Sequence, residues 1–168
     1  MQEKPTEREE LTLSKAAQYL LEECRMVLPG MQALFGFQLI AVFSQTFSDM
    51  LPAPEQMLHL FALILVALAI ALVMTPAAIH RQTGARQVTD SFIEASTRLL
   101  LLSMFPLLFG ICIDLFLIAT IITKSFRASL FISLFMFAVF LILWVFYPKS
   151  SAFRIRPGTK KVQAKDED

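Results

Sequence analysis

Charged residues are scarce in this sequence, and they are confined to a few places. Only 17% of the 168 residues are Asp, Glu, Lys or Arg, whereas soluble globular chains have about 25%. Hydrophobic residues make up 56%, and the mean hydropathy is +0.62. Most of the charges lie near the two ends of the chain and in the segment 80–98, and long apolar runs fill most of the rest. This distribution excludes an ordinary soluble protein, and the length suits a single domain.

Several features that would indicate a particular chemistry are also missing. The net charge is +1, and no arginine-rich patch with interleaved aromatic residues indicates nucleic acid as a partner. The two cysteines, Cys24 and Cys112, are far apart in sequence, and no CxxC motif or Cys/His cluster indicates a disulfide, a zinc site or redox chemistry. GxSxG, HExxH and P-loop motifs are absent. We therefore expect no catalytic residues, no metal and no cofactor, and nothing in the sequence supports an enzyme.

Four apolar runs are long enough to cross the hydrocarbon core of a membrane, which takes about 20 helical residues. They cover residues 28–48, 54–79, 99–123 and 127–148. The predicted fold is therefore all-α, an integral membrane bundle of four helices. Its first helix is the least apolar, because it contains several glutamines, whereas the second has no polar residue at its centre.

An amphipathic arm, residues 1–27, precedes these helices. Apolar residues recur at helical spacing on one face of the arm and just beyond it: Leu13, Ala17, Leu20, Leu21, Cys24 and Leu28. Pro29 and Gly30 are then expected to break or bend the chain. The arm is predicted to lie in the membrane interface with its apolar face down, or to pack against a cytoplasmic loop of the protein. The polar tail, 149–168, is predicted to be disordered and cytoplasmic.

The basic residues are distributed unevenly between the two sides of the predicted bundle. Of the 15 Lys and Arg residues, all but Lys124 and Arg127 lie in the arm, in the segment 80–98 or in the tail. Because loops rich in Lys and Arg stay in the cytoplasm, both ends of the chain are predicted to be cytoplasmic.

Asp114 is the one ionisable residue well inside a predicted span. Ser103, Pro106 and Gly110 precede it at spacings that put all four residues on one stripe of the third helix. Small residues mark the packed face of a membrane helix, so Asp114 is expected to face the bundle interior. Gln38 and Gln45 on the first helix are its candidate partners, since their depths bracket that of Asp114. The first and third helices are therefore expected to be the inner pair, and the second and fourth to be more exposed to lipid.

Two roles for Asp114 remain open at this stage. In the first, its carboxyl group is hydrogen-bonded to a neighbouring helix and holds the bundle together. In the second, it forms part of a site for proton- or cation-coupled transport, because ionisable groups inside a membrane commonly mark such pathways.

The two histidines are not placed to bind a haem together. His59 and His80 lie at opposite ends of the second run, about 30 Å apart at 1.5 Å per helical residue. Both are expected to be interfacial residues with no special role.

A further pattern surrounds the first helix. The residues Arg25, Leu28, Pro29, Gly30, Gln32, Leu34, Phe35 and Phe37 spell RxxLPGxQxLFxF. Phe43 and Gln45 near the end of the first helix and Pro76, His80 and Arg81 at the end of the second extend the pattern. The stretch from Leu21 to Leu117 resembles a family of small four-helix bacterial membrane proteins of unknown function. The resemblance implies four helices and a bacterial inner membrane, and it implies no activity.

The residues that carry this resemblance include a cluster on the predicted cytoplasmic side: Arg25, Gln32, His80 and Arg81. Two arginines and a histidine near the inner headgroups are compatible with binding of anionic lipid. Ordinary anchoring by positive charge explains them equally well.

The sequence therefore favours a structural or accessory multi-pass membrane protein. A small transporter or channel subunit that uses Asp114 is the first alternative, and an anionic lipid-binding protein is the second. The expected partners are the lipid bilayer and either further copies of the chain or another membrane protein.

Overall fold

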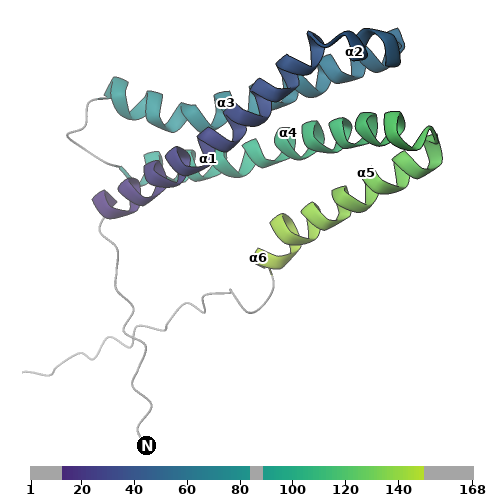
Figure 1. Ribbon diagram of the computed structural model, residues 1–168. Helices are drawn as coiled ribbons and strands as arrows, with labels where there is room; N and C mark the ends of the chain where they lie inside the picture. The colour runs from purple at the N-terminus through teal and green to yellow at the C-terminus, as the bar shows by residue number, and fades with distance from the viewer. Residues whose placement is uncertain (1–12, 84–88, 150–168) are drawn as a thin grey trace, which may run out of the picture.

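The computed structural model describes residues 13–83 and 89–149, which form helices joined by short turns (Figure 1). The helices are α1 (Leu13–Val42), α2 (Gln45–Met50), α3 (Ala53–Thr83), α4 (Asp90–Thr123) and α5 (Phe126–Leu141), and α5 continues through a π-helical turn (Ile142–Phe146) into α6 (Tyr147–Lys149). Four helical stretches, Leu13–Val42, Ala53–Gln82, Asp90–Thr123 and Phe126–Phe146, are long and apolar enough to cross a membrane. The predicted all-α membrane bundle is therefore confirmed. Most of the tail, 150–168, and the first part of the arm, 1–12, lie outside the described residues.

Helix α1 is continuous through Pro29, so of the two outcomes expected at Pro29 and Gly30, a break or a bend, the break does not occur. The residues Ala17, Cys24, Met31 and Gln38 are buried at intervals of seven on both sides of the proline. A seven-residue repeat keeps one face of a helix against its neighbour, so the same face of α1 packs inward on both sides of Pro29. Pro29 itself is exposed on the outer side.

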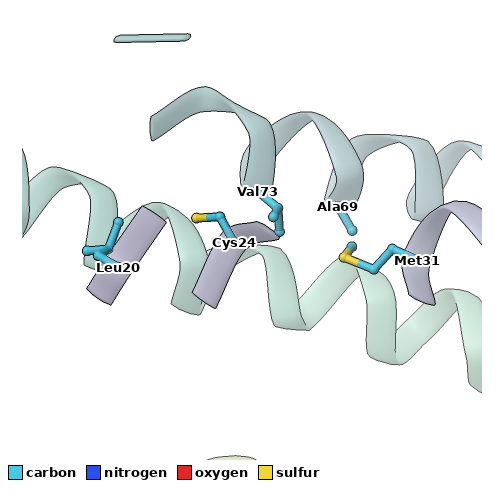
Figure 2. Close-up of a cluster of buried hydrophobic side chains, with 5 residues drawn as sticks. All are labelled: Leu20, Cys24, Met31, Ala69 and Val73. Carbon is cyan, nitrogen blue, oxygen red and sulfur yellow. The ribbon is translucent and has the colours of Figure 1, made fainter. Parts of the chain in front are cut away.

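The apolar face of the arm packs inside the protein. Leu20, Cys24 and Met31 of α1 form a buried cluster with Ala69 and Val73 of α3, as Figure 2 shows. Leu28, Ile70, Leu100 and Leu107 pack around this cluster, so α4 also contributes to it. For the described residues 13–27, the arm is thus the first half of α1, and its buried face packs against α3 and α4.

Helix α1 ends at Val42, earlier than the predicted residue 48. Ser44 has an extended backbone and caps α2, because its hydroxyl oxygen accepts a hydrogen bond from the Phe47 amide at 3.2 Å. Leu51 ends α2 in an extended conformation, which is the conformation favoured for a residue before proline, here Pro52. The carbonyl oxygen of Pro52 then accepts from the Glu55 amide at 2.9 Å and begins α3.

Helices α3 and α4 make the most extensive contact in the bundle. On α3, buried residues recur at alternating steps of three and four: Ala62, Val66, Ala69, Val73 and Pro76. On α4, the buried Ser103, Pro106 and Gly110 confirm that the predicted stripe faces inward. The small side chains let the backbones approach closely, since a Cβ atom on Gly110 would lie 2.8 Å from Val66 Cγ2 and 3.2 Å from the Ala62 carbonyl oxygen.

The prediction that the first and third membrane helices are the inner pair is therefore wrong. The central pair is α3 and α4. In their most apolar 18-residue stretches, 28% and 33% of the residues are buried, against 11% for α1. The polar residues of the first and third runs favour that prediction, whereas in the structure the small residues Ala62 and Ala69 of the second run form the packed seam. For the last helix, the expected exposure agrees with the structure, because only 6% of its most apolar 18-residue stretch is buried.

Helix α5 packs on the outside of α4. The Ser133 hydroxyl donates a hydrogen bond to the Cys112 carbonyl oxygen at 2.7 Å, and the rings of Phe109 and Phe137 lie 5.4 Å apart. The turn between the two helices places Lys124 at φ 51°, the left-handed conformation that commonly ends a helix. Helix α3 ends and α4 begins near the end of the bundle where α1 begins, and α2 lies at the opposite end (Figure 1).

Gly110→Ala is expected to lower the free energy of unfolding by about 1–3 kcal/mol, the typical cost of overpacking. The added methyl group meets Val66 and the α3 backbone, so α3 and α4 must move apart. Unfolding of the purified protein in mixed micelles by increasing denaturing detergent measures this.

Gly36→Ala on α1 is the matched control, because a Cβ there meets nothing within 4 Å. It should leave stability unchanged or raise it by up to about 1 kcal/mol through better helix propensity. Equal decreases in the free energy of unfolding of Gly110→Ala and Gly36→Ala would contradict the close approach of α3 and α4 at Gly110.

A polar cluster that joins three helices

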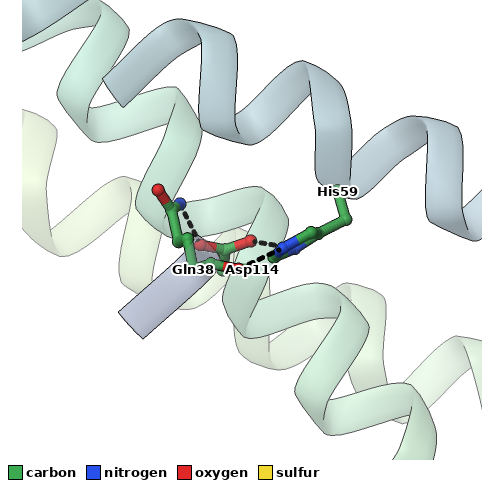
Figure 3. Close-up of polar contacts among 3 residues, drawn as sticks. All are labelled: Gln38, His59 and Asp114. Atoms are coloured by element: carbon green, nitrogen blue, oxygen red, sulfur yellow. Dashed lines mark hydrogen bonds and ion pairs between the residues drawn. The ribbon is translucent and has the colours of Figure 1, made fainter. Parts of the chain in front are cut away.

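The carboxyl group of Asp114 on α4 is hydrogen-bonded by residues from two other helices (Figure 3). The side-chain amide of Gln38 on α1 donates to Oδ2 of Asp114. Nδ1 of His59 on α3 lies 3.1 Å from Oδ1 of the same carboxyl group. Each carboxyl oxygen thus has a partner on a different helix, and one side chain connects α1, α3 and α4.

The second ring nitrogen of His59 determines how many protons the cluster holds. Nε2 lies 3.1 Å from the backbone carbonyl oxygen of Gln38, and because a carbonyl oxygen only accepts, Nε2 must carry a hydrogen. The contact between Nδ1 and Asp114 then needs one more proton, either on Nδ1 of a charged imidazole or on the carboxyl group. In both arrangements the His59–Asp114 pair shares one proton and has no net charge.

The cluster is shielded from the surroundings. The exposed fractions of Gln38 and His59 are 5% and 7%, and 14% of the Asp114 side chain is exposed. The ring of Phe47 on α2 packs edge-on against the His59 ring, with the ring centroids 5.2 Å apart. Among the described residues, Gln38 Oε1 is one of two buried side-chain polar atoms that have no hydrogen-bond partner.

A cavity of about 310 Å³ lies beside the cluster, between α1 and α4. Gln38, His59 and Asp114 are the polar residues among the thirteen that line it. Its other walls are apolar side chains of α1 and α4, together with Phe47 and Leu51 near α2. The site therefore combines an apolar cavity with one small polar region.

The structure brings together only some of the predicted polar residues. Gln38 contacts Asp114 as expected. Gln45 is exposed at the start of α2 and forms no hydrogen bond with Asp114, because α1 ends before it and α2 begins a new helix. The two glutamines are seven residues apart, which would put them on one face only if a single helix contained both.

The expectation that His59 is an interfacial residue with no special role is wrong. His59 is buried and bonded to both Asp114 and the Gln38 backbone. A signal for this was present in the sequence, because His59 lies three residues before Ala62 and so extends the packed seam of α3 by one position. Phe47, which covers the histidine ring, had no such signal.

The predicted cytoplasmic-side cluster is spread over exposed positions. Arg25, Gln32 and Arg81 are exposed, and the half-buried His80 packs against Phe92 with ring centroids 5.9 Å apart. Cys24 and Cys112 are both free and buried, on α1 and α4 respectively. Within residues 13–83 and 89–149, no group of three or more His, Cys, Asp or Glu side chains is placed to hold a metal ion.

Comparison with known proteins gives one result. A model of a family of unknown function, DUF6328, matches residues 3–148. The chain belongs to this family. No curated protein and no solved structure matches it. The family description of DUF6328 gives no activity, so the chemistry of this member is argued from its own side chains.

Asp114→Asn is expected to preserve the fold of this DUF6328 protein, with a loss of less than about 1 kcal/mol. The Asn amide group can donate to Nδ1 of a neutral His59, and its oxygen can accept from Gln38. Asp114→Leu should cost about 1–3 kcal/mol, because it leaves buried polar atoms of Gln38 and His59 without partners. Detergent-induced unfolding compares the two variants.

Asp49→Asn on α2 controls for the removal of a carboxylate, since Asp49 is exposed. It should change stability by no more than about 0.5 kcal/mol. If Asp114→Asn and Asp114→Leu were equally destabilised, the hydrogen bonds to α1 and α3 would not be what holds this residue.

Proposed function

We propose that this DUF6328 protein is a structural or accessory multi-pass membrane protein, in which the Gln38–His59–Asp114 cluster fixes the arrangement of three helices. One observation carries the proposal: both oxygens of the Asp114 carboxyl group are bonded, one by α1 and the other by α3. Such a cluster supplies contacts that join three helices.

The energetics of polar groups in lipid support this role. Apolar side chains gain little from contacting each other rather than lipid, so close packing and interhelical hydrogen bonds decide which helices associate. An unpartnered carboxyl group in the bilayer costs about 2.5–3.5 kcal/mol on insertion scales. Any arrangement that separates Asp114 from Gln38 and His59 is therefore disfavoured, and α1 is held in one register against α3 and α4.

Both ends of the chain are proposed to face the cytoplasm of a bacterial cell, with the protein in the inner membrane. The uneven distribution of Lys and Arg supports this orientation. The bilayer is the main partner, and α5 is a candidate contact for a second copy or another membrane protein. Support for this contact is the exposure of large apolar side chains along α5, among them Phe131 at 72% and Leu134 at 62%.

Cysteine labelling tests the orientation. An impermeant maleimide added to intact spheroplasts should label Lys124→Cys and should label Arg81→Cys only after permeabilisation. Both positions are exposed, and the natural Cys24 and Cys112 are buried at 5% and 6%, so background labelling is low. The reverse pattern of labelling would overturn the orientation.

A flux measurement separates the structural role from transport through Asp114. Wild-type protein, Asp114→Asn and Asp49→Asn in liposomes that contain a pH-sensitive dye should show equal proton flux, no greater than that of liposomes without protein. The same comparison with sodium gradients covers cation coupling. A flux that the wild type supports and that Asp114→Asn abolishes, with folding preserved, would replace the structural role with transport.

A further inference from the structure

We propose that the cavity between α1 and α4 binds an uncharged, lipid-soluble alcohol or phenol, whose hydroxyl group hydrogen-bonds to the polar cluster. This ligand site is an addition to the structural role of the cluster. Its volume of about 310 Å³ lies at the lower end of the range for ligand pockets, roughly 300–1,000 Å³.

The position of the cavity makes it accessible from the side of the bundle. Its walls include Phe37 on α1 and Ile118 on α4, whose exposed fractions are 70% and 53%. Exposed apolar side chains on membrane-crossing helices face lipid. A lipid-soluble molecule therefore reaches the cavity from the bilayer and does not have to cross the packed seam between α3 and α4.

The walls select a mainly apolar ligand with one polar group. Ten of the thirteen lining residues are apolar, and the three polar residues are the members of the cluster. Phe37 and Phe47 provide aromatic surface, and Leu34, Ala41 and Leu115 provide aliphatic surface. A polar group on the ligand therefore has one region in which its hydrogen bonds can be satisfied.

The unused hydrogen-bonding capacity in that region consists mainly of acceptors. A carboxyl group has about four lone-pair positions, and Asp114 uses two of them for Gln38 and His59. Gln38 Oε1 is buried and has no donor. Both ring nitrogens of His59 are already engaged. A ligand that donates a hydrogen bond, such as a hydroxyl group, therefore fits better than a ketone or an ether.

The charge and depth of the site exclude ionic ligands. The His59–Asp114 pair has no net charge, so a cationic or anionic ligand would bring an unbalanced charge into a medium of low dielectric constant. Asp114 also lies nine residues before the end of α4 at Thr123, about 14 Å along the helix at 1.5 Å per residue. A phospholipid headgroup would have to leave the membrane surface to reach it.

Photocrosslinking in lipid nanodiscs tests the proposal. The probe is an alkylphenol with a diazirine on its alkyl chain, and its methyl ether and the alkyl carboxylic acid with the same diazirine are the controls. The phenol should crosslink to peptides containing residues 34–41 and 111–121. The ether, which cannot donate a hydrogen bond, should label these peptides roughly two- to tenfold less, and the acid should also label them less.

A bulky residue in the cavity wall provides the variant. Ala41→Trp fills the cavity without replacing a member of the polar cluster, and it should abolish phenol labelling of both peptides. Ala138→Trp, at an exposed position on α5, is the matched control and should label like the wild type. If Ala41→Trp does not fold, competition in the wild type decides instead: unlabelled alkylphenol should suppress crosslinking, and its methyl ether should suppress it far less.

Three results would overturn the proposal. The phenol could label all lipid-facing helices evenly, with no preference for α1 and α4. The ether or the acid could label the cavity peptides as strongly as the phenol does. Phenol labelling could also persist in a folded Ala41→Trp protein.

Discussion

The carboxyl group of Asp114 lies within an apolar helix, where no water is available to satisfy its oxygens. The chain satisfies them with an amide from α1 and an imidazole from α3, so three helices must meet at one point. The same requirement fixes the ring of His59, because its second nitrogen is bonded to the Gln38 backbone. This contact fixes the register of α1 and leaves the His59–Asp114 pair without net charge. The cavity lies beside it.

The seam between α3 and α4 makes this meeting point possible. Ala62 and Ala69 on α3 and Gly110 on α4 let the two helices approach until a single Cβ atom would no longer fit. Asp114 follows Gly110 by one turn, and His59 precedes Ala62 by one turn. Because Gly110 packs against Ala62, the two side chains lie at the same depth and meet. Helix α1 then lies across this pair, with Cys24, Met31 and Gln38 at intervals of seven on its buried face.

The four membrane-spanning helices could be predicted from hydropathy, and depth indicated Gln38 as one of two candidate partners of Asp114. The partnership of His59 with Asp114 could not be predicted, because the position of a histidine near the end of an apolar run favours an interfacial residue, and its place on the seam is evident only once the packing of α3 on α4 is known. The prediction of which two helices form the central pair is wrong for a related reason. An alanine facing lipid and an alanine in a packed seam contribute equally to hydropathy, so only their spacing of three and four distinguishes them. Continuity through Pro29 depends on packing on both sides of the proline, which local sequence rules for proline do not include.

The central claim is that Asp114 and His59 stabilise the bundle as one bonded unit, and a double-mutant cycle tests it most directly. The free energy of unfolding would be measured in bicelles for the wild type, His59→Leu, Asp114→Leu and the double variant. A bonded pair predicts that the double variant loses at least about 1 kcal/mol less than the sum of the single losses, because each single change leaves a buried polar partner unsatisfied. Additive losses would contradict the claim and would mean that the two side chains act independently.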